Sequence, residues 1–140
     1  MATSVYLSSP VVTINSVALT DQCTSAVVNY SFDQLETTTF GDTARKFGGS
    51  TVTSLQNNSI EIELYQSYAT SETEQTIFGL VGITTNVIVA PASGAASATN
   101  PIYTLTGCFL ESHTPINASL GELSTITLTF AGGVLTKAVS

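Results

Sequence analysis

The stretch that decides the fold is residues 60–82, IEIELYQSYATSETEQTIFGLVG. In its first six residues an aliphatic side chain alternates with a glutamate or a tyrosine, which is the pattern of a strand with one apolar and one solvated face. Farther on, Ile77, Leu80 and Val81 follow the i, i+3, i+4 spacing of an amphipathic helix. We therefore expect one short helix, at about residues 72–81, lying on a sheet.

Signals at both ends delimit this helix. Ser71 and Glu74 have the spacing of a capping box, in which the serine hydroxyl accepts from the Glu74 N–H and the glutamate reaches back to the serine N–H. Glu72 adds negative charge near the positive end of the helix dipole. Gly82 is expected to end the helix, because glycine readily adopts the conformation that follows a helix C-terminus.

Turn signals and apolar alternation divide the rest of the chain into strands. Asn15-Ser16 predicts a tight hairpin, because asparagine tolerates positive φ, and Gly107 is a candidate bulge. Tyr30 and Phe32 are expected on the buried face of a long strand. The clearer expected strands cover residues 12–14, 17–19, 24–32, 60–65, 87–90, 103–109 and 126–130, and residues 5–7, 51–55 and an edge segment after 134 are weaker candidates. Residues 1–140 are thus predicted to form a single mainly β domain, an antiparallel β-sandwich or barrel of six to eight strands with one short flanking α-helix.

Residues 33–50 follow neither the helix nor the strand period, and we expect a long extended loop there. Compact domains seldom leave about 18 residues without structure unless the segment is functional or disordered. Phe40 and Phe47 argue against disorder, because disordered segments are poor in aromatic residues. Arg45 and Lys46 are two of the three basic residues of the chain. Two interpretations stay open: an arm that docks on another copy, or a loop folded back on its own core.

The composition narrows the possible partners. Hydrophobic residues make up 43% and charged residues only 9% of the chain, and the net charge is −7. A low charge with much serine and threonine suggests that part of the surface is covered by other copies. Nucleic-acid binding needs clustered lysine and arginine, so we exclude it as a function.

The sequence offers no pattern for catalysis or for a cofactor. His113 is the only histidine and is interpreted as a surface or loop residue, since no base and orienting acid accompany it. Cys23 and Cys108 are expected to be reduced core residues. Glu61 and Glu63 lie about 7 Å apart on one strand face and are read as a solvated row. No calcium-binding spacing, phosphate loop, export signal or membrane-spanning run is present, so we expect no enzyme, no cofactor, no metal and no membrane partner.

The order of several motifs resembles a known family. These are Val12–Asn15, Glu36–Thr38, Phe40–Arg45, Gly48-Gly49, Ile60–Tyr65, Phe78–Gly82, Ser97–Thr104 and Gly121–Thr125. In order and spacing they resemble the small major tail (tail tube) proteins of tailed bacteriophages, particularly the siphophage type. The segment 51–59 is longer than in that pattern.

This resemblance implies a structural protein of the virion tail, made in the host bacterial cytoplasm. Six copies would form a ring, and stacked rings would join their sheets into a tube that contacts other tail proteins and passes viral DNA without specific binding. The loop 33–50 would reach a neighbouring subunit or ring. Its expected interface residues are Leu35, Phe40, Arg45, Lys46 and Phe47. The candidate acids facing the channel are Asp33, Glu36, Glu61 and Glu63, which would repel phosphates.

Two alternatives are kept beside the tail tube. A capsid decoration (cement) protein would also be small, β-rich and self-associating. A carbohydrate-binding or adhesin module would need a stacking platform, for which Tyr6, Tyr65, Tyr68 and Tyr103 are candidates. The absence of tryptophan weakens that second alternative.

Overall fold

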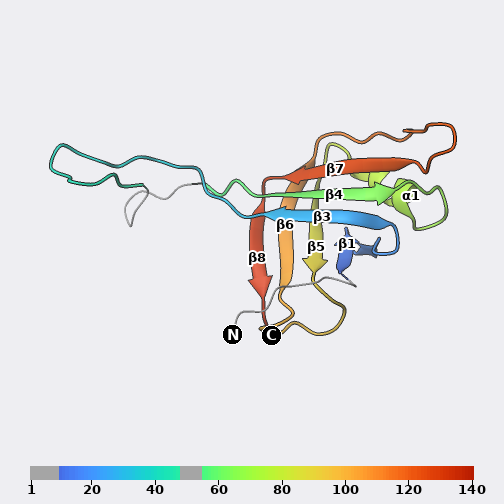
Figure 1. Cartoon of the computed structure of the whole chain (residues 1–140), viewed down its shortest axis with the longest axis horizontal. Coiled ribbons are helices and arrows are strands. Elements are labelled where there is room, and N and C mark those ends of the chain that lie inside the picture. The colour runs from blue at the N-terminus through green and yellow to red at the C-terminus, as the bar shows by residue number, and fades with distance from the viewer. Residues whose placement is uncertain (1–9, 48–54) are drawn as a thin grey trace.

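Two layers of antiparallel strands cross at a large angle in the computed structural model, which describes residues 10–47 and 55–140 (Figure 1). The first layer consists of β3 (Cys23–Asn29), β4 (Ser59–Tyr65) and β7 (Thr125–Ala131). The second consists of β1 (Val11–Ile14), β2 (Val17–Ala18), β5 (Thr84–Ala90), β6 (Ile102–Leu110) and β8 (Val134–Ala138). The mainly β, antiparallel prediction is confirmed, with eight strands in the described part of the chain.

The two layers are joined by strands that continue around a corner. Hydrogen bonding runs without interruption in the order β2-β1-β5-β6-β7-β4-β3, and β8 pairs with β6. One half of β6 pairs with β8 and its last two residues pair with β7. This is the arrangement of orthogonal sheet packing, in which bends and bulges let a strand change layers.

Glycines supply the bend. Thr85 pairs with Cys108 and Asn86 with Thr106, so Gly107 is an extra residue in β6 with a φ of 74°, and the predicted bulge is confirmed. Gly133, between β7 and β8, also has a positive φ, of 81°. A Cβ atom at Gly133 would lie 2.4 Å from the Thr106 carbonyl oxygen, so only glycine fits this close approach.

The core lies between the layers and follows the alternation of the sequence. Ile60, Ile62 and Leu64 of β4 are fully buried, while the residues between them are exposed. The helical segment adds Ile77 and Leu80 from one end of the sandwich. The other large buried side chains are Val12, Ile14, Leu19, Val87, Leu105, Leu110, Ile126, Leu128 and Phe130. Each such side chain stabilises the fold by about 1.5–3 kcal/mol through removal from water.

The predicted helix is present but begins differently. It comprises α1 (Thr73–Ile77) followed by a 3-10 turn, η1 (Phe78–Leu80), and Gly82 ends it with a φ of 84°. The prediction of a capping box at Ser71 and Glu74 is wrong. Glu72 is the N-cap residue and makes no side-chain cap, Ser71 has a φ of 62°, and the Glu74 N–H donates to the Ser67 carbonyl oxygen at 3.0 Å.

Two further expectations concern strand ends. Asn15 and Ser16, with φ values of 50° and 67°, form the predicted hairpin turn. The prediction that Tyr30 and Phe32 are buried is wrong: β3 ends at Asn29, and both rings are exposed and pack edge to face at 5.5 Å. The expected strand 5–7 and most of 51–55 lie outside the described residues.

Candidate assembly surfaces

The hairpin between β3 and β4 extends into a two-stranded ribbon, which we call the arm (residues 31–47 and 55–57). Near the sandwich, the Asp33 N–H donates to the Leu55 carbonyl at 2.8 Å and the Asn57 N–H to the Ser31 carbonyl at 2.7 Å. Farther out, Thr37 N–H donates to the Lys46 carbonyl at 2.9 Å. The described part of the arm points away from the sandwich instead of folding back onto it (Figure 1).

Polar contacts shape the tip of the arm. The Asp42 carboxylate accepts from the Thr39 N–H at 2.8 Å and lies 2.6 Å from the Lys46 ammonium. The hydrogen bond from Lys46, followed by that from the Thr39 backbone, lowers the pKa of Asp42. The Arg45 guanidinium lies 3.7 Å from Glu36, and both side chains are largely exposed. The tip therefore has a defined turn although no core supports it.

The arm also carries apolar side chains that the described chain leaves partly or fully exposed. Phe40 is fully exposed at the tip, and Leu35 and Phe47 are about half exposed. Leu55, on the returning strand, is 74% exposed. Exposed apolar residues gathered on a projecting element are typical of a protein–protein contact. The structure thus brings the five predicted interface residues together on one element.

The predicted acidic residues fall into two groups. Glu61 and Glu63 project from the outer face of β4, with Thr24 donating its hydroxyl to Glu63 Oε1 at 3.1 Å. Asp33 and Glu36 lie on the arm, beyond the ends of the same strands. The outward rows across the first layer are Ser25–Glu63–Thr127 and Val27–Glu61–Thr129. The outer face of this layer is therefore polar and acidic.

One edge of the first layer is open. β3 ends the strand order, so its outer edge has no strand partner among the described residues. Such an edge presents a row of backbone N–H and C=O groups to a further strand. Beside it lies a groove of about 1080 Å³ between β3 and the inner face of the second layer, with Ala26, Val28, Val89 and Leu135 on its walls. The sequence did not indicate this groove, because its lining residues read as ordinary core.

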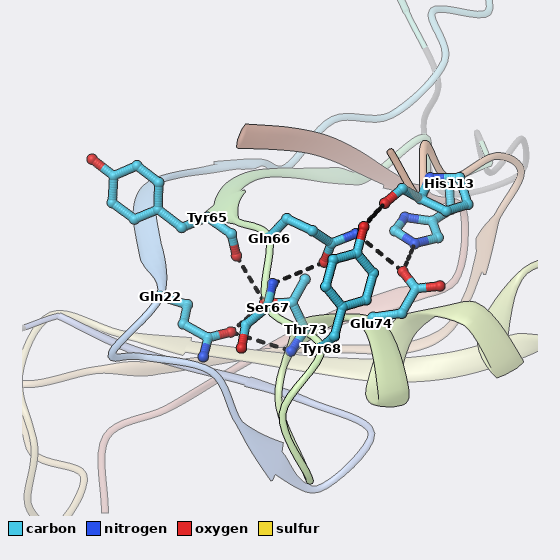
Figure 2. Close-up of polar contacts among 9 residues, drawn as sticks. Gln22, Tyr65, Gln66, Ser67, Tyr68, Thr73, Glu74 and His113 are labelled. Carbon is cyan, nitrogen blue, oxygen red and sulfur yellow. Dashed lines mark hydrogen bonds and ion pairs between the residues drawn. The ribbon is translucent and has the colours of Figure 1, made fainter. Parts of the chain in front are cut away.

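A polar cluster holds the loop between β6 and β7 (residues 111–124) against the helix (Figure 2). His113 Nε2 lies 2.8 Å from Glu74 Oε2, and the histidine side chain is only 1% exposed. Gln66 donates its amide to Glu74 at 3.1 Å and to the Pro115 carbonyl at 2.6 Å, while the Tyr68 hydroxyl donates to that carbonyl at 2.7 Å. His113 is thus a loop residue, as interpreted, but its side chain is buried and not on the surface.

A second set of contacts fixes the helix to the end of β4 (Figure 2). The Thr73 N–H donates to Gln22 Oε1 at 3.2 Å, and the Thr73 hydroxyl donates to the Tyr65 carbonyl at 3.0 Å. Gln22 also donates its amide to Glu72. These contacts fix the start of the helix against β4 and the turn that precedes β3.

The other predicted groups are dispersed. Tyr65 lies on the outer face of β4, Tyr68 donates its hydroxyl to the Pro115 carbonyl and Tyr103 lines the groove, so these three candidates lie at separate places, and Tyr6 lies outside the described residues. Cys108 is buried and Cys23 partly buried, both as free thiols, and burial raises the pKa of each. Within residues 10–47 and 55–140 no cluster of His, Cys, Asp and Glu suits a metal ion. No helix in that part of the chain is long and apolar enough to span a membrane.

The fold is shared with chains of phage-like particles. A chain of the virion of a native gene transfer agent particle is 14% identical, with a TM-score of 0.71 over 97% of this chain and 100% of that one. A chain from the tail of an empty gene transfer agent particle, determined with C6 symmetry, is 15% identical, with a TM-score of 0.62 over 84% and 83%.

A third similar structure comes from a different kind of particle. It is a chain of the sheath/tube terminator of an extracellular contractile injection system, PVC, in the extended state. It is 11% identical, with a TM-score of 0.67 over 99% of both chains. No protein-family model matches the chain, and no curated protein matches its sequence significantly. At these identities the similarity establishes the fold that this chain shares with tail and injection-system components.

Proposed function

We propose that this chain is a tail tube protein that assembles into stacked hexameric rings around a channel for DNA. The observation that carries the proposal is the arm, a hydrogen-bonded ribbon that projects from the sandwich with Phe40 in solvent. A monomer gains nothing from this arrangement, whereas a second copy would bury the exposed side chains. The shared fold with a C6-symmetric tail supports both the tube and the sixfold ring.

The first layer is suited to closing the ring. The free edge of β3 would pair with a strand of the next copy, so that six small sheets become one continuous wall. A ring closed in this way covers the open edge of β3 and needs only one repeated contact. The exposed Val27 at the middle of β3 lies next to that contact.

The distribution of charge indicates which face lines the channel. The outer face of the first layer carries Glu61 and Glu63, and the arm adds Asp33 and Glu36. The second layer, by contrast, is neutral on its outer face, where Thr13, Ile88 and Thr104 lie in one row. A negative wall with few donors repels phosphates and lets DNA slide without binding. We therefore assign the β3–β4–β7 face to the channel and a structural, non-enzymatic role to the protein.

Electron microscopy of the purified chain tests this function. We expect hollow tubes whose end views show six subunits, and antibody label on the tail of the source particle. Label on the head would favour the capsid decoration protein instead. A chain that stays monomeric at high concentration under all conditions would rule out the tube.

A further inference from the structure

We propose that the β6–β7 loop is the surface that receives the arm of a second copy in the next ring. This inference rests on the proposed tube and adds the partner surface of the arm. Three properties of this loop support the inference: its exposed apolar side chains, its fixed conformation and its position opposite the arm.

The loop and the arm lie at opposite ends of the first layer. Ser59, where the arm returns to the sandwich, pairs with Ala131, and Tyr65 at the other end of β4 pairs with Thr125, where the loop enters β7. The arm extends to the left and the loop to the right in Figure 1. Copies that stack head to tail along this direction would bring the arm of one against the loop of the next.

The loop presents apolar side chains to solvent. Ile116 and Leu123 are each 75% exposed and Leu120 is fully exposed. Three exposed aliphatic side chains thus lie within eight residues of one loop, and the arm offers three exposed apolar side chains of its own, Leu35, Phe40 and Phe47. Burial of such a patch against the phenylalanine rings supplies a favourable hydrophobic contribution.

Hydrogen bonds fix the conformation of the loop that exposes these aliphatic side chains. The Asn117 amide donates to the Thr125 carbonyl at 2.8 Å, and the Ser124 hydroxyl donates to the Asn117 carbonyl at 2.6 Å. The polar cluster of Figure 2 fixes Pro115 and His113 on the other side. A loop held at both ends while its aliphatic side chains face water is a preformed contact surface, which lowers the entropic cost of binding.

One basic side chain can orient the contact. The loop contains Glu111 and Glu122, both exposed, and no lysine or arginine. The arm holds three acidic residues beside Arg45 and Lys46, and Lys46 is paired with Asp42. Arg45, whose side chain is 79% exposed and 3.7 Å from Glu36, is therefore the basic group that would face a loop glutamate. Because the two patches differ, the contact is heterologous and continues indefinitely, as a tube requires.

Disulfide trapping between two separately tagged chains tests the contact. One chain carries Gly41→Cys at the tip of the arm, where an added Cβ meets nothing within 4 Å. The other carries Ala118→Cys in the exposed part of the loop, and both carry Cys23→Ser. The matched control replaces Ala118→Cys by Ala95→Cys, in the exposed β5–β6 loop. Tubes formed from the mixture are oxidised and the linked products are identified by mass spectrometry.

We expect tubes to form and the 41–118 link to exceed the 41–95 link at least tenfold. Tubes with equal links, or with no 41–118 link, would overturn the inference and leave the tail tube function intact. Failure of the unmodified chain to assemble would overturn both.

A triple variant, Ile116→Ser with Leu120→Ser and Leu123→Ser, provides an independent readout. These side chains are exposed, so the monomer should keep its melting temperature. Such a chain can offer its arm but cannot receive one, so a small fraction added to the unmodified chain should shorten the tubes several-fold. Unchanged tube length with a folded triple variant would also overturn the inference.

Discussion

His113 Nε2 lies 2.8 Å from Glu74 Oε2 and ties the β6–β7 loop to the helix. The other ring nitrogen, Nδ1, is buried and has no partner among the described residues. Glu74→Ala would leave both ring nitrogens without a partner, so we expect a loss of about 1–3 kcal/mol in the free energy of unfolding. Urea denaturation measures this loss, with Glu111→Ala, at an exposed glutamate, as the control. Equal stabilities of the two variants would mean that the pair does not hold the loop.

Substitutions at the adjacent Gly132 and Gly133 should differ in their effect on stability. Gly132 and Gly133 share a φ of 81°, but only at Gly133 does an added Cβ meet the backbone, 2.4 Å from the Thr106 oxygen. Gly132→Ala should cost about 1–2 kcal/mol for the left-handed conformation. Gly133→Ala should cost about 1–3 kcal/mol more, because the strands must separate. Thermal unfolding of both variants measures the difference. A larger loss of stability for Gly132→Ala than for Gly133→Ala would contradict the close approach of Gly133 to Thr106.

The arm should be dispensable for folding and essential for assembly. Phe40→Ser combined with Phe47→Ser removes exposed rings, so the melting temperature should change little while tubes disappear. Circular dichroism and electron microscopy measure the two outcomes. Phe130→Ala, in the core, is the control and should cost about 3–5 kcal/mol. An unfolded double variant would instead place the two rings in the protein's own core.

Reversing the charge of the first layer should convert the proposed channel into a DNA-binding surface. Glu61→Lys with Glu63→Lys keeps both positions on the solvated face, so folding should persist. Assembled tubes should then retain DNA that is protected from nuclease, and the retention should fall steeply with salt. Thr104→Lys with Thr136→Lys, on the outer face of the second layer, should bind DNA that nuclease removes. Protection by the control variant alone would reverse our assignment of the faces.

The core strands could be predicted from sequence because each one buries a single face. In β4 and β7 every second side chain is aliphatic or aromatic and fully enclosed, so period-2 alternation carries most of the information. Gly107 was also recognisable, since a glycine inside an alternating run commonly marks a bulge. The orthogonal crossing of the layers was not predictable, because it depends on how strands far apart in sequence pair around Gly107 and Gly133.

The errors arose where tertiary contacts override local signals. Glu74 has the right spacing for a cap, but its carboxylate is bound by His113 and Gln66 from other segments. Tyr30 and Phe32 continue the alternation of β3, yet the strand has left the sandwich there and runs into the arm. Local pattern cannot show where a sheet ends.

The sequence predicted one side of the candidate interface, the arm, but not the other side, the β6–β7 loop. The arm stood out because residues 33–50 combine aromatic rings with no regular period. Ile116, Leu120 and Leu123 gave no such signal, since aliphatic residues in a short loop resemble ordinary core until the structure shows that they are exposed. Finding them required the position of Pro115, which is set by the side chains of Gln66 and Tyr68, far away in sequence.

The placement of the basic residues on the arm has a practical consequence for handling the protein. Trypsin cleaves after lysine and arginine, and the chain holds only Arg45, Lys46 and Lys137. Digestion of the free chain would therefore cut the arm after Arg45 and Lys46, whereas Lys137 lies in β8, where its pairing with Tyr103 slows cleavage. A population of subunits already incorporated into particles would resist the first of these cuts, so a protease and a gel distinguish free from incorporated protein without a microscope.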